Sequence, residues 1–387
     1  MKLLRHVAAV AGLLLAPLTW KAGPVAQAPA TSVPIFEYDP TFPKPMRENW
    51  AIGPIGGMAV DRQDHLYVVQ RPGSLASNER FTGSADTPPK ADCCIPAPPV
   101  LEFDYGGTLI HSWGGPGTGY DWPQTEHGVF VDSKDVVWLA GSGEKDAQLL
   151  KFTREGKFLQ QFGKPGMRGG SADTRNMGQP ANLTVDPVSN EVYVADGYGN
   201  RRVIVLDAET FAFKRMWGAY GNKPDDTPLG PYNPDAPPAR QFRLPHNIAI
   251  SRDGFVYVAD RPNNRIQVFR KDGTYVNEVF VSKRTLLQGA ASGFALSTDP
   301  PQRWLYMIDG ANHHVWILER QSLRIVARFG QQGLWGGALN VPHAIAVDGR
   351  GNIYVGENFD ARRFQRFLYR GLGQPRPGTI PPTTLVR

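Results

Sequence analysis

Short apolar segments alternate with turns along most of the chain, and one unit of this pattern recurs six times. Each unit has an apolar segment that usually closes on Asp, then a turn, then a second segment rich in Tyr and Val. Short apolar runs bounded by turn residues predict β-strands. The six copies are residues 58–61 with 66–69, 129–132 with 137–139, 183–186 with 192–194, 248–250 with 256–258, 295–299 with 305–307, and 345–348 with 353–355.

A third and a fourth strand follow each pair. The third alternates in character, as in residues 202–206 and 265–269, and the fourth often ends in an aromatic residue and Gly, as at Trp217-Gly218. Four short strands with a period of about 45–50 residues predict an all-β, six-bladed β-propeller of the NHL-repeat type. To close the ring, residues 34–38 are expected to supply the outer strand of the last blade, whose third strand is residues 364–369.

This pattern divides the chain into four parts. Residues 1–28 are interpreted as a signal peptide, 29–49 as an N-terminal segment, 50–373 as the propeller and 374–387 as a Pro-rich tail. Two insertions, residues 75–99 and 221–239, interrupt the repeats. Loops of this kind lie at the ends of a propeller, where they either cover the channel mouth or are decoration without a role.

Composition fits a folded protein with many turns. Hydrophobic residues make up 41% and charged residues 20% of the 387 residues, with 42 Gly and 34 Pro. The formal net charge is +6, which falls to near +3 without Lys2, Arg5 and Lys21 of the N-terminal segment. A nucleic-acid partner is not expected, because no run of Lys and Arg interleaved with aromatic residues could follow a phosphate backbone.

The first residues have the features of an export signal. Lys2 and Arg5 precede the apolar stretch 7–20, and Ala26-Gln27-Ala28 offers a cleavage site. We expect a secreted or periplasmic monomer without stable membrane insertion after cleavage, since no later segment has 18 apolar residues in a row. An uncleaved anchor is the alternative.

The two cysteines, Cys93 and Cys94, are adjacent in the first insertion. Neighbouring cysteines cannot link distant parts of the chain. They could form a vicinal disulfide in an oxidising compartment, bind a metal, or do neither. We interpret them as a loop feature without a catalytic role.

Three histidines share one position of the repeat. Four residues before the end of the first strand lie Gly56, His127, Ala181, His246, Phe294 and His343, in blade order. Histidine therefore occurs in alternate blades, about 120° apart in a six-fold ring, so the three imidazoles are expected to converge on the axis. The other histidines at 65, 111, 313 and 314 are interpreted as surface or local structural residues.

The three histidines could each be hydrogen-bonded structural residues, but their strict alternation favours a shared metal ion. Neutral imidazole is a good zinc ligand, and three protein ligands with an open fourth position characterise catalytic zinc. The open position takes water or substrate, and the metal acts as a Lewis acid.

Further candidate residues lie where the second strand returns to the same end of the ring. Arg71 and Arg261 occupy one register of blades one and four, and Tyr198 follows the second strand of blade three. Arginine can bind a carboxylate with two parallel hydrogen bonds, and a tyrosine beside a divalent metal can act as a base. Alternatively, the arginines pair with acidic residues in the turns, such as Asp260.

Residues 50–370 resemble the peptidyl-α-hydroxyglycine α-amidating lyases. The similarity is strongest at residues 193–201, which contain Asp196-Gly197-Tyr198, and at residues 244–267, which contain Leu244-Pro245-His246. The resemblance implies that His127, His246 and His343 bind zinc, that Tyr198 is the catalytic base, and that Arg71 and Arg261 bind substrate. It implies cleavage of a C-terminal α-hydroxyglycine to an amide and glyoxylate, with a small molecule or a peptide C-terminal carboxylate as the partner.

The chain departs from that family in three places. Ala344 stands where the family has an aspartate that helps to hold a structural calcium ion, so calcium is not expected here. Val341 replaces a methionine, and Gly199 stands where the family has a cysteine.

Two other functions remain open. A non-catalytic NHL propeller could bind a protein or glycan through one face and would need no metal. A lactonase-like propeller hydrolase typically uses calcium held by Glu, Asp and Asn, so three histidines disfavour it. Fold alone does not decide among these functions.

Overall fold

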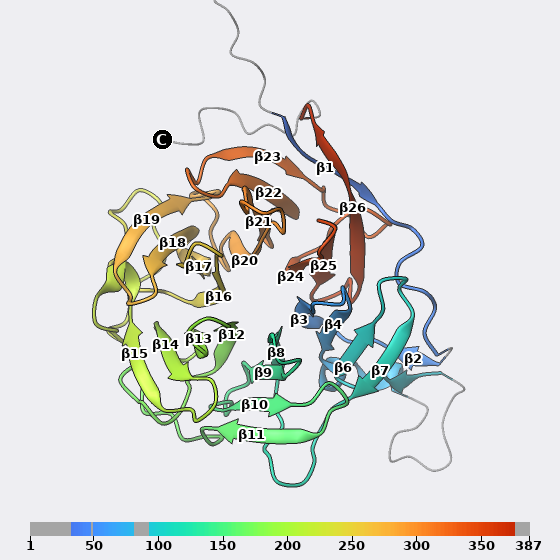
Figure 1. Ribbon diagram of the computed structural model, residues 1–387, viewed down its shortest axis with the longest axis horizontal. Helices are drawn as coiled ribbons and strands as arrows, with labels where there is room; N and C mark the ends of the chain where they lie inside the picture. Colours follow the sequence, from blue (N-terminus) through green and yellow to red (C-terminus); the bar gives the residue numbers. More distant parts are fainter. Residues whose placement is uncertain (1–31, 48, 81–92, 376–387) are drawn as a thin grey trace, which may run out of the picture. The chain divides into compact units, whose positions relative to one another are not determined.

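Six four-stranded antiparallel sheets surround a central axis in the structure, a computed structural model that describes residues 32–47, 49–80 and 93–375 (Figure 1). This arrangement confirms the predicted six-bladed β-propeller. From the inner to the outer strand, blades one to three are β3 (Ile55–Val60), β4 (Leu66–Gln70), β6 (Val100–Phe103) and β7 (Leu109–Trp113); β8 (Glu126–Val131), β9 (Val137–Gly141), β10 (Leu149–Phe152) and β11 (Phe158–Phe162); and β12 (Pro180–Asp186), β13 (Glu191–Asp196), β14 (Arg202–Asp207) and β15 (Phe213–Trp217). Blades four to six are β16 (Pro245–Ile250), β17 (Phe255–Asp260), β18 (Arg265–Arg270) and β19 (Tyr275–Phe280); β20 (Ala291–Leu296), β21 (Trp304–Asp309), β22 (His314–Glu319) and β23 (Ile325–Phe329); and β24 (Pro342–Val347), β25 (Ile353–Glu357), β26 (Phe364–Gly373) and β1 (Val33–Tyr38).

The ring closes as the sequence predicts. Strand β1 lies antiparallel to β26, with Phe36 opposite Tyr369, so blade six contains segments from both ends of the described chain. Phe36 also lies against Tyr306 and Phe329 of blade five, with ring centroids 5.4 and 5.0 Å away. The closing strand therefore joins blade six to blade five as well as completing blade six.

The core consists of apolar layers between neighbouring blades. Between blades three and four, for example, Val203, Val205, Val258 and Phe269 are fully buried. A blade has apolar residues on both of its faces and cannot bury them alone, so stacking in a ring removes them from water.

The remaining elements are short. β2 (Trp50–Ala51) pairs in parallel with β5 (Ile95–Pro96), and the 3₁₀ turns are η1 (Pro72–Ser74), η2 (Ser77–Glu79), η3 (Ala219–Gly221) and η4 (Arg261–Asn263). None of the helical segments in the described part of the chain is long and apolar enough to cross a bilayer. The interpreted signal peptide lies outside the described residues, as do the last twelve residues of the tail.

The adjacent cysteines form a disulfide in the structure. Cys93 and Cys94 are joined to each other directly before β5, and Cys93 is exposed. Of the possibilities that the sequence left open for this pair, the structure has the vicinal disulfide.

Candidate metal centre

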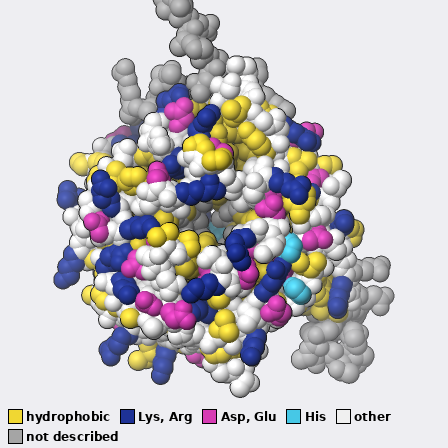
Figure 2. Space-filling model, viewed as in Figure 1, with side chains coloured by type: hydrophobic (Ala, Val, Ile, Leu, Met, Phe, Trp, Pro, Cys, Tyr) yellow, Lys and Arg dark blue, Asp and Glu magenta, His cyan; other side chains and the backbone are white. Residues whose placement is uncertain are grey.

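Each innermost strand contains an irregularity at the same place. The pairing register shifts around Gly56, Ala181, His246, Ser292 and His343, and in blade two over His127 and Gly128. A β-bulge leaves one residue outside the regular ladder and re-aims its side chain. The six blades thus present one such residue each beside the central channel, which is seen as the hollow in the middle of the ring in Figure 2.

In blade five this residue is Ser292, so the sequence-based assignment of Phe294 was wrong by two positions. Leu296 pairs with Leu305 at the end of β20, in the way that Ile250 pairs with Val256 in blade four. Ser297 then begins the turn, since its N–H donates to the carbonyl of Trp304. The repeat pattern predicts instead that the unit ends at Asp299, two residues further on.

The three histidines converge on the axis. Their ring centroids are 4.9, 4.9 and 5.2 Å apart, and one nitrogen of each lies within 4.8 Å of the others. Each ring is steeply inclined to the other two, at 73–84°. The geometry that strict alternation predicts, three imidazoles meeting at one depth, is therefore present.

A main-chain carbonyl fixes the orientation of each imidazole. His127 Nδ1 donates to the carbonyl of Ala181 (2.7 Å), His343 Nδ1 to that of Ile55 (3.1 Å), and His246 Nδ1 to that of Ser292. In every case the acceptor belongs to the first strand of the next blade. A metal-binding histidine commonly gives its second ring nitrogen to such a partner, which sets the tautomer and leaves Nε2 free to bind.

The three rings are neutral. Their residues are 2–5% exposed, and burial lowers the pKa of each imidazole well below its usual value. The charges of Arg71 and Arg261 lower all three pKa values further, and neighbouring histidines do so for His127 and His343. Neutral imidazole is the form that binds a metal, so the site does not have to lose protons first.

Tyr198 lies beside two of the histidines. Its hydroxyl is 3.0 Å from His127 Nε2 and 2.9 Å from His246 Nε2. The preceding residue has to be glycine, because a Cβ at Gly197 would lie 2.1 Å from the carbonyl oxygen of Pro245. The turn after β13 thus packs directly on the strand that carries His246.

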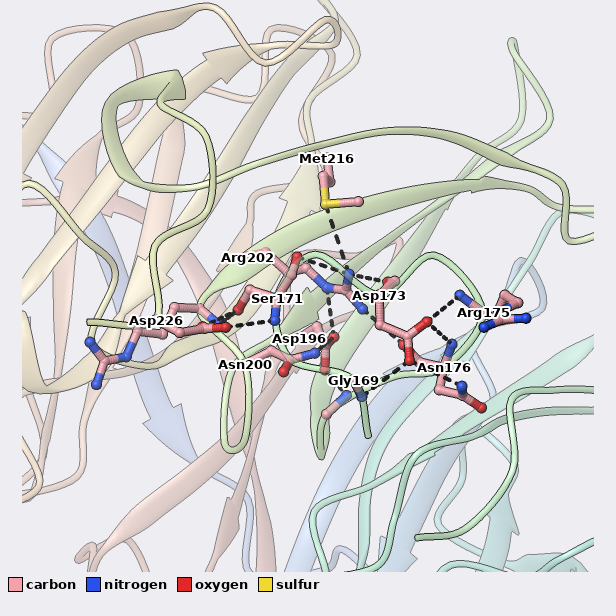
Figure 3. A network of polar contacts seen from close by, with 12 residues as sticks. Gly169, Ser171, Asp173, Arg175, Asn176, Asp196, Asn200, Arg202, Met216 and Asp226 are labelled. Carbon is pink, nitrogen blue, oxygen red and sulfur yellow. Dashed lines mark hydrogen bonds and ion pairs between the residues drawn. The ribbon is translucent and has the colours of Figure 1, made fainter. Parts of the chain in front are cut away.

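A buried ion pair holds this turn in place (Figure 3). Asp196 and Arg202 are both fully buried, and Arg202 Nε donates to Asp196 Oδ2 at 2.9 Å. Asn200 donates to the same oxygen at 2.7 Å, and the remaining guanidinium groups bind carbonyls of the 171–176 loop, including Ser171 at 3.1 Å. All three guanidinium nitrogens of Arg202 therefore donate hydrogen bonds, which fix the turn that contains Tyr198.

Arg261 reaches the histidines from blade four. It is 7% exposed, and its NH1 lies 3.5 Å from His246 Nε2 while NH2 donates to Gln288 Oε1 at 2.5 Å. Its Nε is buried without a hydrogen-bond partner in the described chain. A buried donor without a partner costs free energy, and such a group often marks a place for a ligand.

Arg71 lies on the opposite side of the histidines. Its Nε donates to the carbonyl of Glu126, the residue before His127, at 2.8 Å. Burial lowers the pKa of its guanidinium, and the charge of Arg261 acts in the same direction. Within the described residues neither arginine forms an ion pair, and Asp260 pairs instead with Arg265 at 3.0 Å. The alternative that turn carboxylates neutralise these arginines is therefore wrong for the described chain.

The other histidines of the described chain do not belong to the group of three. His65 and His111 both contact Glu102, a fully buried carboxylate that also binds Arg154. Asp61, His65 and Glu102 have metal-ligand spacing, but the Arg154 guanidinium already lies among them. This cluster is a network of ion pairs that links blade one to Arg154 of blade two.

The residue that follows the last histidine offers no metal ligand. Ala344 is 7% exposed and packs among apolar residues between blades six and one, including Met58 and Tyr354. Its methyl group stands where the resembling family has a calcium-binding aspartate. A calcium ion here would lack that side-chain ligand.

Sequence reasoning missed the groups that support the site. The three acceptor carbonyls are main-chain atoms and have no residue signature, and Gln288 comes from a loop outside the repeats. Together, the described residues provide three imidazole Nε2 atoms that could bind a metal, an adjacent phenol, the buried cation of Arg261 and the partly exposed cation of Arg71. Such a set could hold one metal ion beside a carboxylate-bearing molecule.

Comparison with known proteins finds NHL-repeat proteins and amidating lyases. The family model of the NHL repeat matches residues 242–269, which include His246 and Arg261. The chain is 29% identical over 249 residues to NHL repeat-containing protein 3 of Mus musculus, covering 62% of this chain but only 58% of that protein. It is 22% identical to the probable peptidyl-alpha-hydroxyglycine alpha-amidating lyase pgal-1 of Caenorhabditis elegans, covering 84% of this chain and 85% of that protein.

Among solved structures, a streptogramin B lyase superposes with a TM-score of 0.50 at 12% identity, covering 88% of this chain and 98% of that one. This likeness concerns the fold alone. The chain is thus a six-bladed β-propeller with an NHL repeat in its fourth blade, and in sequence it resembles the peptidyl-α-hydroxyglycine α-amidating lyases.

Proposed function

We propose that the protein is a metal-dependent lyase that cleaves the C–N bond of an N-acyl α-hydroxyglycine to an amide and glyoxylate. The observation that carries the proposal is the convergence of His127, His246 and His343, with the Tyr198 hydroxyl 3.0 and 2.9 Å from two of their nitrogens. The similarity to pgal-1 over 84% of the chain supports it.

The three histidines suit zinc, which takes three nitrogen ligands and an open position in catalytic sites. When bound, such an ion would supply a Lewis acid that polarises the substrate hydroxyl. The chain's own residues do the rest. Arg261 and Arg71 bind the carboxylate, and the unpartnered Nε of Arg261 gains an acceptor.

Tyr198 moves the proton in this proposal. Its oxygen accepts the proton of the substrate hydroxyl as its own phenolic proton passes on, and the hydroxyl oxygen becomes the aldehyde oxygen of glyoxylate as the C–N bond breaks. The electron pair of that bond goes to the amide nitrogen, which needs one proton to become a neutral amide. The proton held by Tyr198 balances this demand, so no outside oxidant or reductant is required.

Export to an oxidising compartment also belongs to the proposal. It rests on the apolar N-terminal segment and agrees with the disulfide between Cys93 and Cys94.

A direct test is the release of glyoxylate from a synthetic N-acyl α-hydroxyglycine by the purified protein, with and without added zinc. We expect zinc-dependent release that a chelator abolishes. Release that is indifferent to zinc and chelator would contradict the metal-dependent mechanism.

The alternative is a binding module without catalysis. The similarity to NHL repeat-containing protein 3 favours it, since that name states a repeat and no reaction. A protein that takes up no metal and releases no glyoxylate would fit this second function.

A further inference from the structure

A groove of about 970 Å³ extends from Arg261 over blade five. Its inner end includes Arg261 and Gln288, which are hydrogen-bonded to each other. Its outer end includes Trp316 of β22 and Arg328 of the outermost strand, β23. The groove therefore shares Arg261, whose NH1 lies 3.5 Å from His246 Nε2, with the site that the proposed function uses.

The loop of residues 282–288 forms one wall of this groove and is firmly held. Asn264 donates to the carbonyl of Thr285 (2.7 Å), and Asn312 donates to its hydroxyl (3.0 Å). Tyr232 of the second insertion donates to the carbonyl of Lys283 at 2.7 Å. This loop nevertheless presents Leu287 with 95% of its surface exposed. Because hydrogen bonds fix the loop, flexibility does not explain why the Leu287 side chain is exposed to solvent.

Backbone strain marks the same groove. Leu287, Val341 and Phe359 line it and have φ angles of 60°, 48° and 51°. The left-handed region costs a non-glycine residue about 1–2 kcal/mol, and a β-branched residue adopts it rarely. Such strain persists where the surroundings enforce it and gathers at ligand sites. Phe359 is also 48% exposed, so the strained residues offer apolar surface to an occupant.

The outer part of the groove is cationic. Arg284 is paired with Asp235 at 2.8 Å, whereas Lys283 and Arg328 have no ion pair in the part of the chain that the structure describes. Arg328 lies over the ring of Trp316, with 5.5 Å between its guanidinium carbon and the ring centroid. Unpaired positive charge that could bind a carboxylate is therefore present at Arg328 in the outer part of the groove and at Arg261 at its inner end. The groove also has the apolar surface of Leu287 and Phe359.

We propose that this groove binds the acyl half of the substrate as an extended peptide. An apolar side chain next to the scissile bond would pack on Leu287 and Phe359, and an acidic residue further upstream would face Arg328. This inference rests on the proposed function, which places the terminal carboxylate at Arg261. Three strand spacings across the blade give about 15 Å, the length of about four extended residues.

The test uses peptides that end in glycine, which carry the carboxylate but have no hydroxyl and cannot be cleaved. A peptide ending Glu-Ala-Ala-Phe-Gly is compared with one that has Ser for Phe and one that has Lys for Glu, by calorimetry on the full chain. Leu287→Asn should weaken binding of the Phe peptide about tenfold and leave the Ser peptide unchanged. Arg328→Gln should remove the preference for Glu over Lys, about two- to fivefold.

Leu334→Asn is the matched control, because Leu334 is 60% exposed on the neighbouring loop and does not line the groove. Asn tolerates positive φ, so Leu287→Asn should fold normally. Equal binding of the three peptides, or no effect of Leu287→Asn, would overturn the groove proposal. Groove-dependent binding without glyoxylate release from the matching α-hydroxyglycine peptides would instead reject the lyase and keep the groove as a site for peptide C-termini.

Discussion

The even-numbered and odd-numbered blades share one backbone and differ in what they give to the axis. Blades two, four and six supply His127, His246 and His343. Blades three, five and one supply the carbonyls of Ala181, Ser292 and Ile55, each of which accepts a hydrogen bond from the histidine of the preceding blade. The bulge that aims the histidines also exists in the odd blades, where its residue has no ligand side chain.

The repeats of one chain can thus have two roles, supplying the candidate metal ligands and orienting them. The repeated backbone places one residue of each blade beside the axis. The side chain at that position determines whether the blade offers a metal ligand or only a carbonyl that orients a neighbouring histidine. Because the support comes from main-chain atoms, it survives most substitutions in the odd blades. We therefore expect point mutations to act through the even-blade rings, the residues that approach them, or the turns that hold those residues.

Removing the Tyr198 hydroxyl should have the largest effect, because this phenol is the odd-blade side chain that reaches the even-blade histidines. We expect Tyr198→Phe to lower kcat for glyoxylate release about 10²–10⁴-fold, the usual contribution of a proton-transferring group. Metal content should not change. Loss of metal together with activity would make Tyr198 a structural support of the histidines and contradict its role as proton carrier.

Breaking the buried ion pair beneath Tyr198 should cost stability. Asp196→Asn leaves the fully buried Arg202 without its counter-charge and should reduce the free energy of unfolding by about 3–5 kcal/mol, measured by denaturant titration. Asp260→Asn in blade four, which breaks the pair with Arg265, should cost less, because Arg265 also pairs with Glu278 at 3.5 Å. Asp235→Asn is the control, because its pair with Arg284 is exposed and should matter little. Equal stability of all three variants would contradict this account.

Replacing Arg261 should weaken substrate binding more than it harms the fold. We expect Arg261→Gln to raise KM about 10–100-fold, since a charge-assisted hydrogen bond contributes about 1.5–3 kcal/mol. Stability should hold or improve, because the variant removes a buried Nε without a partner. Arg270→Gln, an exposed arginine of the same blade, should leave KM unchanged. A fall in kcat with constant KM would show that Arg261 acts only in the transition state.

Acid should destabilise the metal-free protein through the three histidines. Their pKa values are lowered by burial in the folded chain, whereas unfolded histidine titrates near pH 6.5. The unfolded state therefore binds more protons below about pH 6.5, and stability falls as the pH falls, by about 1.4 kcal/mol per pH unit for each histidine. His246→Asn should reduce this slope by one histidine's share. The same slope in this variant as in the wild type would contradict the neutral state of the three buried histidines.

The repeat pattern predicted most of the fold. Alternating strands with turn residues gave the six blades, and the apolar run before Tyr38 gave the closing strand that the structure pairs with β26. The register in blade five was missed because Thr298-Asp299 resembles the Val-Asp ending of four other units, whereas Ser297 takes that place through its hydrogen bond to Trp304. Sequence spacing cannot distinguish a strand that ends before Ser297 from one that ends before Asp299, because only the pairing of the strands shows where the strand ends.

The candidate site was partly accessible from sequence. Alternating histidines at one register predict convergence, because a closed ring fixes the angles between blades. The acceptor carbonyls, Gln288 and the groove over blade five depend on loops of irregular length, whose course no periodicity determines. Strain at Leu287 and Val341 is likewise visible only in the backbone angles.

Elemental analysis will show whether the three even-blade histidines hold one metal ion. The mature protein, purified without a metal-affinity tag, is compared with a His246→Ala variant and a His313→Ala control. We expect about one zinc per chain in the wild type and the control, and almost none in His246→Ala. No metal in the wild type after incubation with zinc, or full retention by His246→Ala, would contradict this expectation.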